Sequence, residues 1–314
     1  MDLKSKIYVA GHNGMVGSAI WKNLKNKGFT NLIGKSSGEL DLRNSESVNK
    51  FFNKEKPDYV FLAAAKVGGI YANNKFRGEF IFDNLSIQNN IIHQCHVSGV
   101  KKLLFLGSSC IYPKNSNQPI KEMSLLTGPL EPTNEPYAIA KISGIKLCES
   151  YYYQYGLNAI SIMPTNLYGA NDSFDLKNSH VLPALLRKFH DGKIDKSERV
   201  EIWGTGKPLR EFLHVDDLAE ACTFLMSKIN AKDLYEKKIS HINVGSGEEI
   251  SIEDLAHLIK KITEFKGSLF FNKDKPDGMY RKLLDSNMIN EMGWAPRITL
   301  EDGISNLYEW YKNN

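Results

Sequence analysis

Two side chains four residues apart, Tyr137 and Lys141, form a pair that could transfer protons. Residues 137–155 have a helical pattern, and this spacing places both side chains on one helix face, about 6 Å apart along the axis. An ammonium group beside a phenol favours the phenolate, so the tyrosine could exchange a proton nearer neutral pH than a free phenol. Ser108 ends an apolar run about 30 residues earlier. The three residue types predict an acid–base site.

A glycine-rich turn near the start of the chain has the spacing G-x-x-G-x-x-G, from Gly11 to Gly17. It follows the strand-like run 7–10 and precedes a helical pattern that continues to about Asn26. Such glycines let the backbone turn tightly and approach a pyrophosphate, which meets the positive end of the helix. The turn therefore predicts a dinucleotide cofactor.

The end of the second expected strand indicates which dinucleotide is bound. NAD-binding folds carry an acidic residue about 20 positions after the glycines, where it binds the ribose hydroxyls. Here Lys35 stands 18 residues after Gly17, followed by Ser36 and Ser37. A cation with hydroxyls suits a 2′-phosphate, so we expect NADP rather than NAD.

Apolar runs alternate with helical patterns through the first half of the chain. This alternation predicts an α/β fold, a doubly wound parallel sheet (Rossmann) with a smaller α/β C-terminal substrate lobe. We expect residues 1–165 to form the dinucleotide-binding domain, with a returning segment at about 212–244, and residues 166–211 and 245–314 to form the nucleotide-sugar-binding lobe. The expected strands are 7–10, 31–34, 59–64, 103–107 and 159–163, and the expected helices include 45–53, 84–96 and 137–155.

Composition excludes several classes of protein. Hydrophobic residues make up 42% of the 314 residues and charged residues 24%, which is ordinary for a globular chain. The net charge of +4 is scattered, which argues against a nucleic-acid partner, and no apolar run is long enough for a membrane helix. The N-terminus lacks a signal peptide pattern, and four widely spaced cysteines form no C-x-x-C pair, so we expect a cytoplasmic protein without a metal site.

Longer motifs resemble one family over essentially the whole chain. The glycine turn, Ser108, Tyr137 and Lys141 together look like an extended short-chain dehydrogenase/reductase. The rest of the pattern resembles the GDP-L-fucose synthase family, the GDP-4-keto-6-deoxy-D-mannose 3,5-epimerase/4-reductases. The segments that carry this resemblance are 63–70, 107–113, 131–141, 163–169, 178–181 and 210–217.

The resemblance implies the role of each catalytic residue. Ser108 and Tyr137 would hold the C4 carbonyl of the sugar, with Tyr137 donating the proton, and Lys141 would bind the nicotinamide ribose. Cys110 would be the base that removes protons beside the ketone, and His180 the acid that returns them. A thiol and an imidazole have pKa values near the working pH, as general acid–base catalysis favours.

The resemblance also implies the binding residues. Known members carry arginines at the positions of Asn13 and Ser37, which leaves Lys35 as the nearest cation for the 2′-phosphate. The cofactor, NADP (NADPH), would be bound by Gly11, Asn13, Gly14, Met15, Val16, Gly17, Lys35, Asp41, Leu42, Ala63, Ala65, Asn84, Lys141, Pro164, Asn166, Leu167 and His180. The GDP-sugar would be bound by Ser108, Ser109, Asn166, Arg187, Trp203, Arg210 and Asp277.

Several alternatives remain open from the sequence. The enzyme could act as a 4-reductase only, on a related GDP-4-keto-6-deoxy-heptose, or as another nucleotide-sugar epimerase of the same superfamily. A dehydratase would place an acidic pair where Ser109-Cys110 stands, and a regulatory protein without catalysis would lack Tyr137 or Lys141. We also expect a homodimer through the helices near 84–96 and 137–155, with Ile87, Ile91, Leu147 and Tyr151 on their outer faces.

Overall fold

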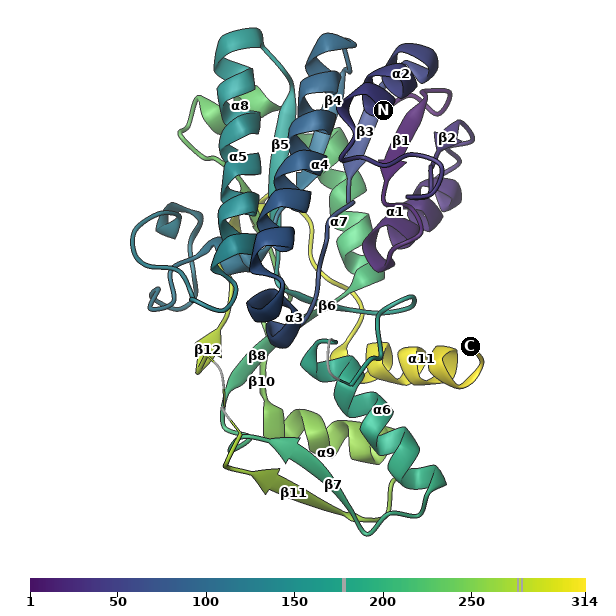
Figure 1. Cartoon of the computed structure of the whole chain (residues 1–314), viewed down its shortest axis with the longest axis vertical. Coiled ribbons are helices and arrows are strands. Elements are labelled where there is room, and N and C mark those ends of the chain that lie inside the picture. Colours follow the sequence, from purple (N-terminus) through teal and green to yellow (C-terminus); the bar gives the residue numbers. More distant parts are fainter. Residues whose placement is uncertain (177–178, 276, 278) are drawn as a thin grey trace.

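A parallel sheet of six strands forms the centre of the larger lobe (Figure 1). The computed structural model describes residues 1–176, 179–275, 277 and 279–314, so Asn178 of the 178–181 motif lies outside the described residues. Parallel pairing in the order β2-β1-β3-β4-β5-β9 confirms the doubly wound fold. The strands are β1 (Ile7–Ala10), β2 (Leu32–Ile33), β3 (Tyr59–Leu62), β4 (Lys102–Leu106), β5 (Ala159–Pro164) and β9 (Ile242–Val244).

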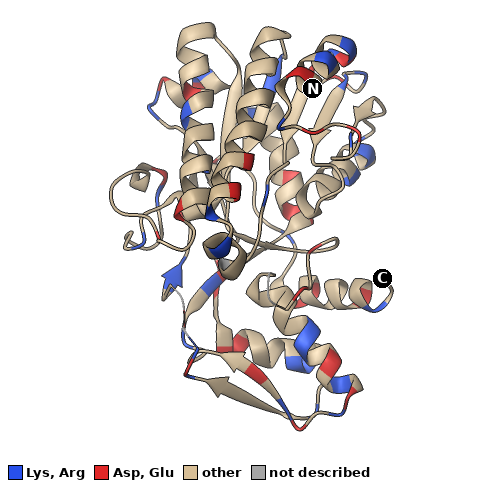
Figure 2. Ribbon diagram, viewed as in Figure 1, with Lys and Arg blue, Asp and Glu red and all other residues tan. Residues whose placement is uncertain are grey.

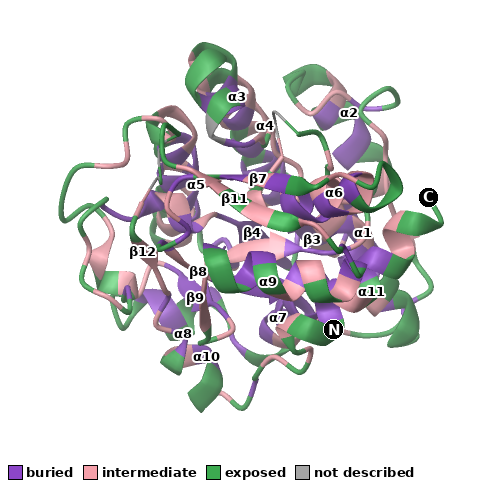
Figure 3. Ribbon diagram, turned by 90° about the horizontal axis from the view of Figure 1, so that it is seen from below, coloured by how far each residue is buried: buried purple, intermediate pink, exposed green. Residues whose placement is uncertain are grey.

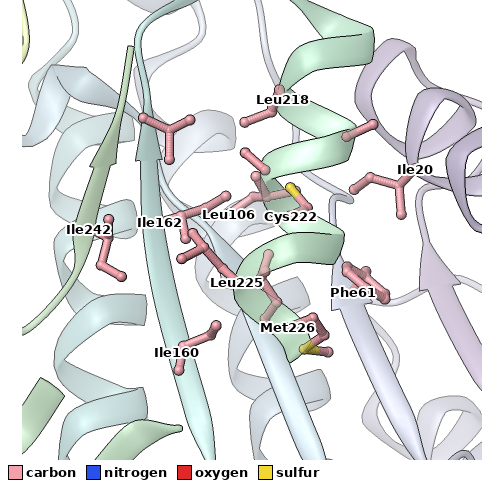
Figure 4. Close-up of a cluster of buried hydrophobic side chains, with 14 of the residues drawn as sticks. Ile20, Phe61, Leu106, Ile160, Ile162, Leu218, Cys222, Leu225, Met226 and Ile242 are labelled. Atoms are coloured by element: carbon pink, nitrogen blue, oxygen red, sulfur yellow. The ribbon is translucent and has the colours of Figure 1, made fainter. Parts of the chain in front are cut away.

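Helices cover both faces of this sheet, which is why its strands are apolar along their whole length. On one face α7 (Val215–Lys228) packs beside α1 (Met15–Asn26), and Leu218, Cys222 and Leu225 of α7 pack against the sheet together with Ile162 (Figure 4). The second core cluster covers the other face. Its helices are α2 (Ser45–Glu55), α4 (Arg77–Val97) and α5 (Glu135–Tyr155). The short α8 (Ala231–Tyr235) contacts α5, but its buried side chains belong to the first core cluster.

Helix α4 begins at Arg77, seven positions before the expected start at Asn84. Its first turns are stabilised by tertiary packing, because Phe80 is 2% exposed and its ring lies edge-on to the Tyr137 ring, with 6.3 Å between centroids. The short α3 (Ile70–Lys75) precedes it. This early start places α4 against the part of α5 that carries Tyr137.

The smaller lobe contains a four-stranded sheet and a two-stranded ribbon (Figure 1). In the sheet, β8 (Leu209–His214) pairs with β6 (Asn166–Tyr168), β10 (Glu249–Ser251) and β12 (Arg281–Lys282). The ribbon of β7 (Arg199–Trp203) and β11 (Ser268–Asn272) keeps exposed residues on one face (Figure 3). Its helices are α6 (Val181–Ile194), α9 (Ile252–Thr263) and α11 (Leu300–Lys312), and their buried side chains share a third core with the ribbon. The short α10 (Asn287–Glu291) instead packs against β9 and the first core of the larger lobe.

In the part of the chain that the structure describes, every helix falls short of the length and apolar character that crossing a membrane requires. The four cysteines are free, and Cys95, Cys148 and Cys222 are fully buried, whereas Cys110 is half-buried. Basic and acidic residues are interspersed over both lobes, and both residues of β12 are basic (Figure 2). Cys110 is therefore the one cysteine side chain of the four that remains accessible.

Candidate active site

The glycine turn at the end of β1 has the shape of a phosphate cradle. Gly11 has φ of 86°, and a Cβ there would lie 2.8 Å from the Cα of Ala64. A Cβ on Gly17 would lie 2.0 Å from the Gly11 carbonyl oxygen. Gly14 caps α1 without a side-chain hydrogen bond, so the first backbone N–H groups of the helix are free to bind an anion. These residues fit a dinucleotide pyrophosphate.

The loop after β3 completes this part of the cleft. Ala10 and Leu62 are paired in register, so Gly11 and Ala63 follow neighbouring strand ends. Asn84 accepts from the backbone N–H of Lys66 and donates to its carbonyl, both at 3.0 Å. Because its amide is used in this way, Asn84 would act on a cofactor by holding the loop that carries Ala63 and Ala65.

The side chain of Lys35 lies next to a carboxylate that the sequence analysis did not identify. Its ammonium is 3.0 Å from Glu39, which also accepts hydrogen bonds from the backbone N–H and hydroxyl of Ser36. These bonds, with the nearby ammonium, lower the pKa of Glu39 to about 2. The cation at this strand end, expected to suit a 2′-phosphate, therefore has an acidic neighbour. Asp41 is likewise paired, with Arg43 at 2.9 Å, and Leu42 packs against the core.

Ser108 connects the residues of the expected catalytic centre. It follows β4, and its side chain interacts with the side chains of both Tyr137 and Cys110, lowering the pKa of each. Lys141 lies one helical turn from Tyr137, with its ammonium 5.7 Å from the tyrosine ring centroid, and donates to the Leu106 carbonyl at 2.8 Å. The end of one strand and one turn of α5 thus bring four chemically competent groups together.

Burial sets the protonation of this cluster. Desolvation raises the pKa of Tyr137 far above that of a free phenol, and the neighbouring Cys110 raises it further, although Ser108 opposes this. The pKa of Lys141 falls to about 8, also through desolvation. Burial therefore has the largest effect on the pKa of Tyr137. Tyr137 is kept as the neutral phenol, the form that can donate a proton.

The two residues expected for epimerisation, Cys110 and His180, are both affected electrostatically by Lys282. Desolvation raises the pKa of Cys110, while Lys282, Ser108 and Lys141 lower it. His180 is the N-cap of α6 and an exposed residue. Desolvation by the surrounding protein lowers the pKa of His180, and the positive charge of Lys282 lowers that pKa further.

The remaining expected substrate residues lie on the smaller lobe or beside it. Asn166 donates to the Glu211 carbonyl at 2.8 Å, and Ser109 is buried at the start of a short 3₁₀ turn. Trp203 is 54% exposed at the end of β7, with the ammonium groups of Lys188 and Lys275 each 5.5 Å from its ring.

The charged members of that set already have partners within the protein. Arg187 donates to the Phe174 carbonyl at 3.1 Å and pairs with Asp191 at 3.5 Å. Asp277 accepts from the backbone N–H of Thr205 at 2.6 Å and from its hydroxyl at 2.8 Å. It also interacts electrostatically with Arg210. A GDP ligand that binds Arg187, Asp277 or Arg210 would compete with the partners that these side chains have within the protein.

Sequence reasoning missed Lys282, which interacts electrostatically with Cys110, His180 and Arg210. It lies on a two-residue strand about 170 positions after Cys110 in the chain. No local pattern distinguishes it from the other lysines, so only the pairing of β12 with β8 identifies it.

Comparison with known proteins agrees with the fold and shows the family. The sequence profile of the NAD dependent epimerase/dehydratase family matches residues 7–245. GDP-L-fucose synthase 1 of Arabidopsis thaliana is 56% identical over 313 residues, covering 100% of this chain and 95% of the relative. These matches extend through both lobes.

Solved structures are similar over the same length. A GDP-6-OMe-4-keto-L-xylo-heptose reductase from C. jejuni is 44% identical with a TM-score of 0.95, covering 100% of this chain and 99% of that one. A GDP-L-fucose synthetase from Naegleria fowleri, bound to NADP, is 29% identical with a TM-score of 0.90, covering 100% and 96%. The chain therefore belongs to the NAD dependent epimerase/dehydratase family, in the group that contains the GDP-L-fucose synthases.

Proposed function

We propose that this enzyme converts GDP-4-keto-6-deoxy-D-mannose into GDP-L-fucose, by epimerisation at C3 and C5 and reduction of the C4 ketone with NADPH. The observation that supports the proposal is the position of the Ser108 side chain, which interacts with both Tyr137 and Cys110 and lowers the pKa of each. One carbonyl oxygen bound there would be next to a proton donor and a base.

Reduction uses the Tyr137 side of the cluster. NADPH, when bound in the glycine cradle, supplies the hydride for C4. Tyr137 is held neutral by burial, so it can donate a proton to the C4 oxygen as negative charge develops there. Ser108 orients that oxygen through a second hydrogen bond. The Lys141 ammonium, fixed by the Leu106 carbonyl, lies where it can bind ribose hydroxyls and stabilise the Tyr137 oxyanion.

Epimerisation uses the part of the cluster that contains Cys110. The Cys110 thiolate takes the proton from C3 or C5, and the electron pair of the broken C–H bond moves into an enolate whose oxygen is bound by Ser108 and Tyr137. His180 then donates a proton to the opposite face of the same carbon and regenerates the ketone. The proton passes from Cys110 back to solvent or His180 before the next turnover.

GDP would bind along the smaller lobe. Arg187 and Arg210 offer guanidinium groups for the diphosphate, and Trp203 offers an exposed ring for the base or a sugar. Asn166, Ser109 and Asp277 supply hydrogen-bonding groups at the edges of the cleft. We also propose that the lobes divide as the sequence suggests, with 1–165 and about 212–244 binding the cofactor.

The direct test is incubation with GDP-4-keto-6-deoxy-D-mannose and NADPH, followed by NMR of the product stereochemistry at C3, C4 and C5. GDP-L-fucose is the expected product. A reduced product with unchanged C3 and C5 would overturn the epimerase half.

A second candidate function is reduction alone, on a GDP-4-keto-6-deoxy-heptose. It is supported by the 44% identity to a heptose reductase over the whole chain. The same assay with a heptose substrate compares kcat/KM for the two sugars and separates these functions.

We further propose that the protein works in the cytoplasm as a homodimer through α4 and α5. The outer face of these helices carries Phe82, which is 67% exposed, and Ile139, which is 40% exposed. Ile87, Leu147 and Tyr151 lie beside them, partly buried. The expectation that Ile91 belongs to this face is wrong, because Ile91 is fully buried in the core beneath α4.

A further inference from the structure

A chain of buried polar side chains ends at Tyr112, the residue that closes the short turn carrying Cys110. The Tyr112 hydroxyl lies 2.6 Å from Nε2 of His241 and donates a hydrogen bond to the side-chain oxygen of Asn243. The Ser240 hydroxyl lies 2.8 Å from the other ring nitrogen of His241. Tyr112, His241 and Asn243 are at most 2% exposed. Buried polar groups of this kind specify one arrangement when all of them are satisfied.

The contacts of Tyr112 determine the direction of each hydrogen bond in this chain. Because the single proton of the Tyr112 hydroxyl goes to Asn243, Nε2 of His241 must carry the proton of the bond between His241 and Tyr112. Burial lowers the pKa of His241 to about 3, so its ring is neutral and Nδ1 accepts from the Ser240 hydroxyl. The Tyr112 hydroxyl thus accepts one hydrogen bond and donates another, which fixes its position from two directions.

Asn243 is itself held by groups from two other segments of the chain. Its side-chain amide donates to the Ile120 carbonyl at 2.9 Å and to the Asp285 carbonyl at 3.2 Å. Its backbone N–H donates to the Glu122 carboxylate at 3.0 Å. Asn243 belongs to β9 and is in register with Met163 of β5. The acceptor of the tyrosine hydroxyl is therefore anchored in the main sheet.

The turn between Ser108 and Tyr112 is supported separately at its two ends. At its start, the Gly107 N–H donates to the Ile162 carbonyl at 2.9 Å, which joins the end of β4 to β5. Within the turn, the Ile111 N–H donates to the Ser108 carbonyl at 3.2 Å. At its end, the side chain of Tyr112 is held by the buried polar chain. Loss of the tyrosine hydroxyl would therefore release the end of the turn and leave its start in place.

Cys110 is the middle residue of this turn. Its neighbours Ser109 and Ile111 are buried, whereas Cys110 is half-buried. The turn thus keeps the thiol accessible while the side chains on either side of it lie in the interior. Any shift of the end of the turn would move the thiol more than it moves Ser108.

We propose that Tyr112 is a positioning residue for epimerisation, whose buried hydroxyl sets the position of the Cys110 thiol. This inference rests on the proposed function, in which the thiolate removes protons from C3 and C5. A general base must lie within hydrogen-bond reach of the proton that it takes, and a displacement of about 1 Å can cost about 10²-fold in rate. C4 reduction uses Ser108 and Tyr137, which are held by β4 and α5, so it does not depend on Tyr112.

Tyr112→Phe tests the hydrogen bonds alone, because it removes the hydroxyl and keeps the ring. The variant is incubated with GDP-4-keto-6-deoxy-D-mannose and NADPH in deuterium oxide, and deuterium at C3 and C5 is measured by NMR and mass spectrometry. Incorporation should fall between about tenfold and about 10²-fold, the cost of a misplaced base. The rate of C4 reduction should change far less, so the ratio of exchange to reduction should fall.

Tyr235→Phe is the matched control. Tyr235 is 1% exposed, and its hydroxyl donates to the Ala159 carbonyl at 3.0 Å, so this variant also loses a buried tyrosine hydrogen bond. Thermal unfolding should show a loss of stability in both variants, but Tyr235→Phe should keep the wild-type ratio of exchange to reduction. If Tyr112→Phe also keeps that ratio, its hydroxyl only stabilises the fold and the proposal is overturned.

Two substitutions of His241 test the chain at a second residue. A glutamine side chain can place an N–H near the position of Nε2, so His241→Gln should largely keep the exchange rate. His241→Met has no donor and should lose exchange as Tyr112→Phe does. Equal exchange rates in these two variants would contradict the proposal. The same pair decides the question if Tyr112→Phe does not fold.

Thiol titration separates this inference from the proposed function, because it needs no substrate. Alkylation of Cys110 by iodoacetamide is followed by mass spectrometry over a pH series, with Cys110→Ser as the background. The Ser108 side chain lowers the pKa of Cys110, so a displaced turn in Tyr112→Phe should raise the apparent pKa of the thiol. An unchanged titration would overturn the positioning role. A wild type that incorporates no deuterium would overturn the proposed function, while the titration still decides the role of Tyr112.

Discussion

The ammonium nitrogen of Lys141 donates a hydrogen bond to the backbone carbonyl of Leu106, with 2.8 Å between the two atoms. Leu106 is the last residue of β4, two positions before Ser108. The bond therefore ties the catalytic turn of α5 to the strand that presents Ser108 and Cys110. Lys141 is almost completely buried there, and this burial lowers its pKa to about 8.

We predict that reduction weakens as the pH rises through about 8. Lys141 carries its ammonium below that pKa and loses it above, because burial disfavours the charged form. The value of kcat/KM for NADPH reports the enzyme before cofactor binds, so it should fall on the alkaline side. A profile that stays flat through this range would contradict a required ammonium. Lys141→Met should be poorly active at every pH.

Tyr137→Phe should reduce the rate of C4 reduction on the order of 10²–10⁴-fold, the usual cost of losing a general acid. The phenylalanine keeps the edge-on contact with Phe80, so the fold should be retained. NADPH oxidation in single-turnover experiments measures the effect. Wild-type turnover in this variant would show that another group protonates the C4 oxygen.

Cys110→Ser should stop exchange of the C3 and C5 protons with solvent while C4 reduction stays measurable. A serine hydroxyl is far less acidic than a thiol, so the substitution keeps the shape and removes the base. Deuterium incorporation, followed by NMR and mass spectrometry, gives both rates. His180→Asn, which should slow reprotonation, is the companion variant. Exchange at the wild-type rate in Cys110→Ser would assign the base elsewhere.

Lys35→Ala should raise KM for NADPH about tenfold and leave KM for NADH nearly unchanged, since a hydrogen bond to a charged group contributes about 1.5–3 kcal/mol. The expected effect is at the lower end because Glu39 shares the ammonium. Steady-state kinetics with the two cofactors provide the test, with NADH as the internal control. An equal change in both KM values would place Lys35 away from the 2′-phosphate.

Phe82→Glu should convert the proposed dimer into a monomer, because it would bury a charge in an apolar contact between copies. Light scattering after gel filtration measures the molar mass. Phe270→Glu on β11 is the matched control, since Phe270 is also exposed, at 42%, but lies in the smaller lobe. A monomeric wild type at micromolar concentration would overturn the dimer itself.

Local sequence determined the parts of this protein that depend on neighbouring residues. The apolar run Ile7–Ala10 and the glycines after it specify a strand and a phosphate cradle, because Gly11 and Gly17 occupy positions where any Cβ would strike the backbone. Tyr137 and Lys141 share a face because of helical periodicity alone. Such features need no knowledge of the rest of the fold.

Tertiary structure decided the features that depend on distant partners. Burial by distant segments raises the pKa of Tyr137 far above that of a free phenol, which helical spacing alone cannot show. Lys282 affects the electrostatics of Cys110 only because β12 pairs with β8 and Glu211 binds the neighbouring backbone. The types of the catalytic residues could thus be inferred from sequence, whereas their protonation and their electrostatic support depend on which distant segments the fold packs around them.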